Sequence, residues 1–89
     1  MARFEMTTLD VRETTADGGA PDALFQLGIM YCAGREVELD LIQAHKWFNL
    51  SALRGNPEAR RYRAEIAREM TKTQVARAQR LAREWLAVN

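Results

Sequence analysis

The sequence predicts an all-α protein in which helix-turn-helix units stack as a small solenoid. The run from Ala23 to Gly55 holds two helical patterns of apolar residues, and a glycine follows each pattern. The segment Gly-Ala-Pro-Asp-Ala at residues 19–23 returns as Gly-Asn-Pro-Glu-Ala at residues 55–59, an offset of 36 residues. An offset of this size is typical of helix-turn-helix repeats. We therefore expect four to five helices in stacked antiparallel hairpins.

The central hairpin has clear start and stop signals. Pro21 suits the first position of a helix over residues 21–33, and Gly34 can adopt the left-handed conformation that ends it. After a short loop, Asp40 is the predicted N-cap of a second helix that runs to Arg54. Gln43, three residues after Asp40, would complete a capping box.

Two more helices are predicted after Gly55. Asn56 and Pro57 form a cap and a first helical position, and helical spacing continues to Met70. Thr71 and Gln74 form a second predicted capping box, which opens a helix that runs to about Ala87. The apolar face of this last helix comprises Val75, Ala78, Leu81, Ala82 and Trp85.

The offset also divides the chain into three parts within a single domain. Carried backwards, it predicts a degenerate helix over about residues 4–17, although the threonines there lower the helix propensity. Residues 1–20 are then a degenerate N-terminal helix or arm. Residues 21–55 form the repeat, and residues 56–89 form a diverged C-terminal capping hairpin.

Residues 21–55 resemble a Sel1-like repeat, a relative of the tetratricopeptide repeat, and the tail resembles the closing segment of short bacterial members of that family. The repeat-defining positions are Ala23, Leu27, Gly28, Tyr31, Gly34, Ala44, Trp47, Ala52 and Gly55. The chain departs from the pattern at Glu36, where a glycine is common, and at Arg63-Ala64. The resemblance implies a non-catalytic scaffold or adaptor that binds other proteins, and it implies close approach of paired helices at Gly28 and Ala44.

Composition and charge bear on the compartment and on the oligomeric state. There is no run of about 18 apolar residues that could span a membrane, and no apolar secretory leader follows Met1, so we expect a cytoplasmic protein. Residues 1–53 carry four bases and eight acids, and residues 54–89 carry nine bases and four acids, which gives −4 and +5. This charge separation, and the small core that so few helical units can bury, predict a homodimer.

The residue inventory argues against an enzyme. Cys32, His45 and a nearby carboxylate are the only possible nucleophile–base–acid set, and the surroundings of Cys32 are apolar. One histidine and one cysteine cannot supply a four-ligand metal site. We therefore assign no catalytic, cofactor or metal residues, and we expect Cys32 to be a buried structural cysteine and His45 a partly exposed residue beside the helix seam.

The dense bases of the C-terminal half support an alternative function. They include Arg60, Arg61, Arg63, Arg68, Lys72, Arg77, Arg80 and Arg83. A basic stripe on one face would favour nucleic acid, but glutamates are interleaved with these bases, so binding of an acidic surface is the more plausible form of this alternative. Nucleic acid is therefore an unfavoured partner.

Four apolar residues are the candidate partner-binding positions. The helix over residues 21–33 is apolar nearly all round, so Phe25 and Ile29 need cover from residues 1–17 or from a second subunit. Ile42 and Leu53 share a second, narrower apolar side of the following helix. That side either contacts a neighbouring helix within the chain or remains exposed for a partner.

Overall fold

The computed structural model describes residues 19–89, which form four α-helices and contain no β-strand. The helices are α2 (Pro21–Ala33), α3 (Leu41–Leu53), α4 (Pro57–Ala67) and α5 (Lys72–Val88). The all-helical prediction is confirmed for these residues. The predicted helix over residues 4–17 lies outside the described part of the chain.

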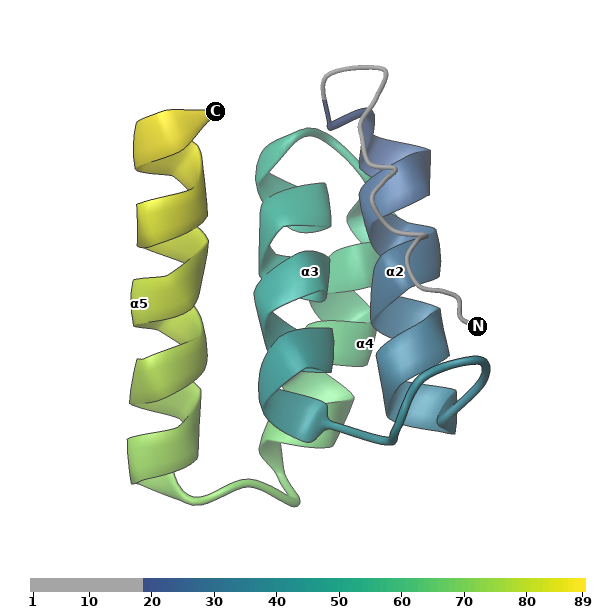
Figure 1. Cartoon of the computed structure of the whole chain (residues 1–89), viewed down its shortest axis with the longest axis vertical. Helices are drawn as coiled ribbons and strands as arrows, with labels where there is room; N and C mark the ends of the chain where they lie inside the picture. Colours follow the sequence, from purple (N-terminus) through teal and green to yellow (C-terminus); the bar gives the residue numbers. More distant parts are fainter. Residues whose placement is uncertain (1–18) are drawn as a thin grey trace.

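Helix α3 lies at the centre of the arrangement. It packs against α2 on one side, against α5 on the opposite side and against α4 on a third side (Figure 1). Within residues 19–89, no other pair of helices approaches as closely as α3 approaches its three neighbours. The core is therefore divided between two sides of one helix.

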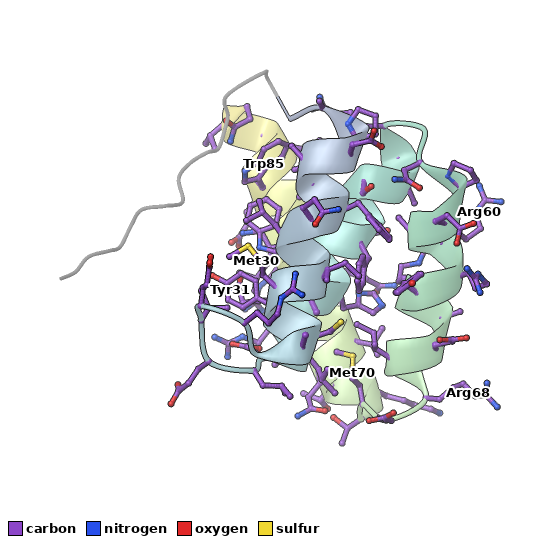
Figure 2. The ribbon with its side chains drawn as sticks, turned by 90° about the vertical axis from the view of Figure 1, so that its right-hand side faces the viewer. Met30, Tyr31, Arg60, Arg68, Met70 and Trp85 are labelled. Carbon is purple, nitrogen blue, oxygen red and sulfur yellow. The ribbon has the colours of Figure 1, made fainter. Side chains whose placement is uncertain are left out.

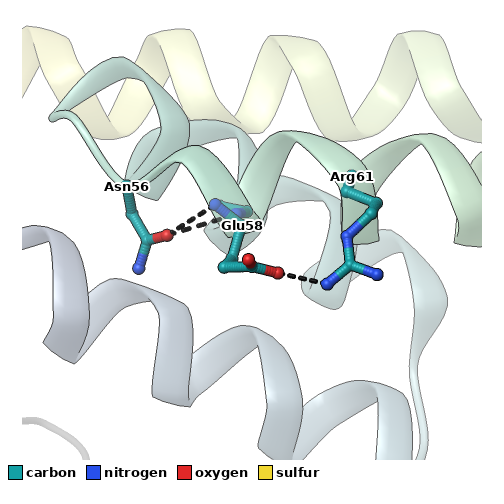
Figure 3. A network of polar contacts seen from close by, with 4 residues as sticks. Asn56, Glu58 and Arg61 are labelled. Carbon is teal, nitrogen blue, oxygen red and sulfur yellow. Dashed lines mark hydrogen bonds and ion pairs between the residues drawn. The ribbon is translucent and has the colours of Figure 1, made fainter.

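Local signals account for most of the helix boundaries. Gly34 follows α2 with a φ of 69°, in the left-handed conformation predicted for it. The capping box of Thr71 and Gln74 opens α5 with both of its hydrogen bonds present. The side chain of Asn56 accepts hydrogen bonds from the backbone N–H groups of Glu58 and Ala59 (Figure 3).

The predicted capping box at the start of α3 is only half formed. The backbone N–H of Gln43 donates to the Asp40 carboxylate at 3.1 Å, as expected. The backbone N–H of Asp40 donates instead to the carbonyl oxygen of Tyr31, at 3.0 Å. The α2–α3 connection thus turns back onto the last full turn of α2. The N–H of Asp40 is therefore bonded to Tyr31 and does not donate to the side chain of Gln43, as a complete capping box would require.

The start of α2 is tied to the end of α3 by polar contacts. The buried hydroxyl of Ser51 donates to the carbonyl oxygen of Pro21 at 2.7 Å, and Asn56 Nδ2 donates to Asp22 Oδ1 at 3.3 Å. Ala20, the N-cap of α2, has no side-chain hydrogen bond of its own. Tertiary contacts therefore hold the end of the helix that lacks a local cap.

Helix α4 is shorter than predicted. It ends at Ala67, and the N–H groups of Arg68, Glu69 and Met70 each bond to the carbonyl three residues earlier. Such bonds tighten the last turn of a helix, and here they lead directly to the cap at Thr71.

Candidate interaction surfaces

The first side of α3 is an aromatic junction between three helices. Phe48 is fully buried, and its ring lies 5.6 Å from that of Phe25 on α2 and 5.5 Å from that of Tyr62 on α4, centroid to centroid. Phe25 and Tyr62 meet edge to face at 5.1 Å. Aromatic pairs at such distances and tilts are favourable beyond the area they bury.

Gly28 makes room for this junction. A Cβ atom at Gly28 would lie 2.5 Å from two carbons of the Phe48 ring, which is far inside van der Waals contact. The sequence led us to expect that Gly28 lets two backbones approach. The structure shows that the space left by Gly28 is filled by the Phe48 ring of α3.

The second side of α3 is the seam with α5. Trp47 and Trp85 meet edge to face with their ring centroids 5.9 Å apart, and Leu50 is fully buried beside them. Two small residues of α5, Ala78 and Ala82, are buried in the interior. We refer below to these two sides as the Phe48 junction and the tryptophan seam.

Cations cover the tryptophan seam. The Lys46 ammonium lies 4.2 Å from the centre of the Trp47 ring, and the Arg54 guanidinium lies 5.6 Å from that of Trp85. Partial burial lowers the pKa of Lys46, and the nearby negative charge of Glu84 opposes that effect. The amphipathic stems of both side chains can shield the rings while their charges stay near water.

The predicted partner-binding residues differ in how far they are exposed. Phe25 and Ile29 are half-buried and pack on the Phe48 junction, so this chain itself covers much of both side chains. Ile42 is also half-buried. Leu53, at the last position of α3, is 63% exposed.

Three further apolar side chains are exposed and were not predicted. They are Leu39 in the α2–α3 connection, which is 61% exposed, and Leu86 and Val88 near the end of α5, at 37% and 81%. Leu39 could have been found from the sequence, because it stands between Glu38 and Asp40 in a segment without helical periodicity. For Leu86 the only sequence signal is its helical position, which lies outside the apolar face predicted for α5.

The repeat-defining positions fall mostly in the interior. Gly28 and Ala44 are buried, and Tyr31 and Ala52 pack partly buried against the Phe48 junction. Trp47 lies in the tryptophan seam. Ala23 and Leu27 are half-buried, whereas Gly34 and Gly55 are exposed where α2 and α3 end.

His45 is buried, with 3% of its surface exposed, and not partly exposed as predicted. It follows the buried Ala44 and lies on α3, where its imidazole meets the charge of Arg63 on α4. Burial, and then that positive charge, lower the pKa of His45. Nδ1 has no hydrogen-bond partner within residues 19–89. Arg63 itself donates to the side-chain oxygen of Asn49 on α3.

Cys32 has no activating neighbour among the described residues. It is half-buried against the Phe48 junction, and burial raises the pKa of its thiol. A raised pKa reduces the fraction of thiolate, which is the nucleophilic form.

The basic residues of the C-terminal half lie on two helices. Arg60 on α4 and Arg68, which follows the end of α4, project away from the other helices (Figure 2). Arg61, on the same helix, forms an ion pair with Glu58 (Figure 3). On α5, Arg80 approaches Glu84 at 3.7 Å, and both side chains are largely exposed.

The described residues offer no metal-binding group and no membrane-spanning helix. Within residues 19–89, no three His, Cys, Asp or Glu side chains gather as metal ligands would. No helix in that range is long and apolar enough to cross a bilayer. Comparison with known proteins finds no family, no curated protein and no solved structure that matches this chain.

Proposed function

We propose that this chain is a non-catalytic protein-binding module in which residues 21–55 form a Sel1-like hairpin and Leu53 belongs to the docking surface. The observation that carries the proposal is the exposure of Leu53, at 63%, on a helix that is otherwise enclosed by three neighbours. A large apolar side chain fixed on such a helix can be buried by a partner at little cost in ordering.

Burial of Leu53 by a partner would contribute a modest binding free energy. Complete burial of a leucine side chain contributes about 1.5–3 kcal/mol, so covering the exposed part of Leu53 would contribute about 1–2 kcal/mol. An anchor of that size, surrounded by weaker polar contacts, is typical of a small interface whose affinity rests on a few residues.

The chemistry of the described residues supports the absence of catalysis. Cys32 has a raised pKa, and His45 has a lowered pKa and an Nδ1 atom without a hydrogen-bond partner within residues 19–89. A nucleophile and a base that act together need a hydrogen bond between them, and no such bond joins these two side chains.

A photo-crosslinking residue in place of Leu53 tests the proposal in the cells that express the protein. We expect a discrete covalent adduct with another protein at this position. The matched control carries the same residue in place of Ala64, which is exposed on α4. Equal adducts at both positions, or none at Leu53, would contradict the proposal.

Binding of an acidic surface or a nucleic acid remains the alternative function, and exposed bases favour it. Lys72, Arg77, Arg80 and Arg83 are all exposed on α5, with Glu84 the only acid of that helix. Titration of labelled DNA and RNA at low salt tests the nucleic-acid form of this alternative. Tight binding that Arg77→Gln and Arg83→Gln together abolish would support it, and binding that these changes leave intact would oppose it.

A further inference from the structure

The outer face of α5 has no partner within the described residues. The helix packs closely only against α3, and its opposite face is open to solvent. Residues 72–88 carry Lys72, Arg77, Arg80 and Arg83 against Glu84, which gives four bases minus one acid, or +3. Leu86 lies three residues after Arg83, so the two are neighbours on the helix surface.

A complementary feature lies on the other side of the molecule. The α2–α3 connection, residues 34–40, carries Glu36, Glu38 and Asp40 against Arg35, which gives one base minus three acids, or −2. All four charged residues are exposed, and Leu39 is 61% exposed among them. Each feature thus combines charge of one sign with an exposed leucine.

The chain cannot join these two features within one molecule. Helix α3 stands between α2 and α5, and the α2–α3 connection lies beside α2, on the side away from α5 (Figure 1). The two charge sets therefore face different directions. They can be brought together only between copies.

We propose that the outer face of α5 binds the α2–α3 connection of a second copy of this chain. The proposal goes beyond the proposed function, because it concerns two surfaces that do not include Leu53. Leu39 of one copy meets Leu86 of the next, and the carboxylates around Leu39 meet Arg80 and Arg83, which precede Leu86 at three-residue spacing along the same side of α5. Because the two surfaces differ, the contact is head-to-tail, and it propagates into short chains of molecules rather than closing as a symmetric dimer.

The association is weak and sensitive to salt. Exposed charges separated by more than about 8 Å are screened at physiological ionic strength, so low salt strengthens the contact. One leucine on each surface and a few exposed ion pairs make a small interface, for which we expect dissociation constants in the range of about 10 µM to 1 mM.

Sedimentation velocity with designed variants tests the proposal. The loop variant carries Glu36→Lys with Glu38→Lys, and the helix variant carries Arg80→Gln with Arg83→Gln. Asp40 is left unchanged because it caps α3. The wild type should form concentration-dependent oligomers at low salt, and each variant alone should associate at least about tenfold more weakly.

Mixing the two variants gives the decisive result. The loop variant keeps a basic α5, and the helix variant keeps an acidic connection, so one contact remains between them and the other is lost. The mixture should therefore form one-to-one complexes and nothing larger. The control variant Glu65→Lys with Glu69→Lys makes the same charge change at exposed positions on α4 and just after it, and it should associate as the wild type does. Circular dichroism confirms that each variant is folded.

Several outcomes would overturn the proposal. They are a wild type that stays monomeric up to about 1 mM at low salt, variants that associate as the wild type does, and a variant mixture without complexes. The Leu53 crosslinking experiment separates the two proposals. A monomeric wild type with a specific Leu53 adduct removes only self-association, whereas a monomeric wild type without an adduct removes both.

Discussion

The Phe48 junction and the tryptophan seam lie on opposite sides of α3 and are built differently. In the junction, rings from three helices contact one another around the fully buried Phe48. In the seam, Leu50, Ala82 and Leu24 of α2 lie beside two half-buried tryptophans that are covered by cations. The buried indole N–H of Trp47 has no acceptor among the described residues.

This difference teaches how the helices depend on each other. The junction couples α2, α3 and α4, so loss of one ring affects all three helices. The seam is the main contact that holds α5, since α5 packs closely only against α3, and an unpaired donor there reduces what the apolar contact contributes. We therefore expect α5 to be the helix that separates from α3 at the lowest cost in free energy.

The largest expected effect comes from truncating a ring on each side. Phe48→Ala should lower the free energy of unfolding by about 3–5 kcal/mol, because it leaves a cavity at the meeting point of three helices. Trp85→Ala should cost less, about 1.5–3 kcal/mol, because its ring is only half-buried. Denaturant unfolding followed by circular dichroism measures both, and equal losses would contradict the comparison.

A second prediction concerns the close approach in the Phe48 junction. Gly28→Ala should destabilise the protein by up to about 2 kcal/mol, since overpacking costs about 1–3 kcal/mol and better helix propensity returns about 1 kcal/mol. In a Phe48→Leu background the same substitution should cost much less. If Gly28→Ala stabilises the wild type, the ring does not need the space that the glycine leaves.

A third prediction concerns pH and the α3–α4 contact. The pKa of His45 is lowered in the folded state, first by burial and then by the positive charge of Arg63 on α4. As pH falls, the imidazole therefore binds a proton more readily in the unfolded chain than in the folded protein. Stability from this site is therefore fully present above about pH 6.5, the ordinary pKa of histidine, and is lost as pH falls toward the lowered pKa.

Unfolding in denaturant at several values between about pH 5 and 8 measures this effect. His45→Gln should remove the part of the pH dependence that belongs to the imidazole, even if it lowers stability at every pH. Trp85→Ala, on the other side of α3, should keep that dependence. Parallel pH profiles for the wild type and His45→Gln would show that the imidazole contributes nothing to it.

The smallest expected effect concerns the α2–α3 connection, which belongs neither to the Phe48 junction nor to the tryptophan seam. Glu36 has a φ of 67°, a left-handed conformation that costs a residue other than glycine about 1 kcal/mol or slightly more. Glu36→Gly should therefore raise the free energy of unfolding slightly, by less than about 1 kcal/mol after the added flexibility of the unfolded glycine. Glu38→Gln is the control for the lost charge alone. A Glu36→Gly variant less stable than Glu38→Gln would contradict this expectation.

Local sequence signals predicted the helices well, because their causes act over a few residues. The proline starts, the left-handed Gly34, the Asn56 cap and the Thr71 capping box all appear where they were expected. The half-formed capping box at Asp40 is the exception, and its cause is the nonlocal bond to Tyr31.

The candidate surfaces could be predicted only in part. Leu53 was a candidate partner-binding residue and is exposed. Phe25 and Ile29 were candidates because α2 is apolar nearly all round, but the Phe48 junction covers part of both side chains. The exposure of Leu39 and Leu86 and the burial of His45 were missed. Each of these depends on which side of an element meets a neighbour, and periodicity alone does not specify that neighbour.

By itself the sequence determined the helical class, the ends of most helices and the separation of charge along the chain, because propensity, capping and composition are local quantities. The tertiary structure decided that α3 is central, that Gly28 faces a ring, that His45 is buried with a lowered pKa, and that the acidic connection and basic α5 lie apart. These features depend on the relative placement of whole helices, which arises from packing between residues far apart in the chain.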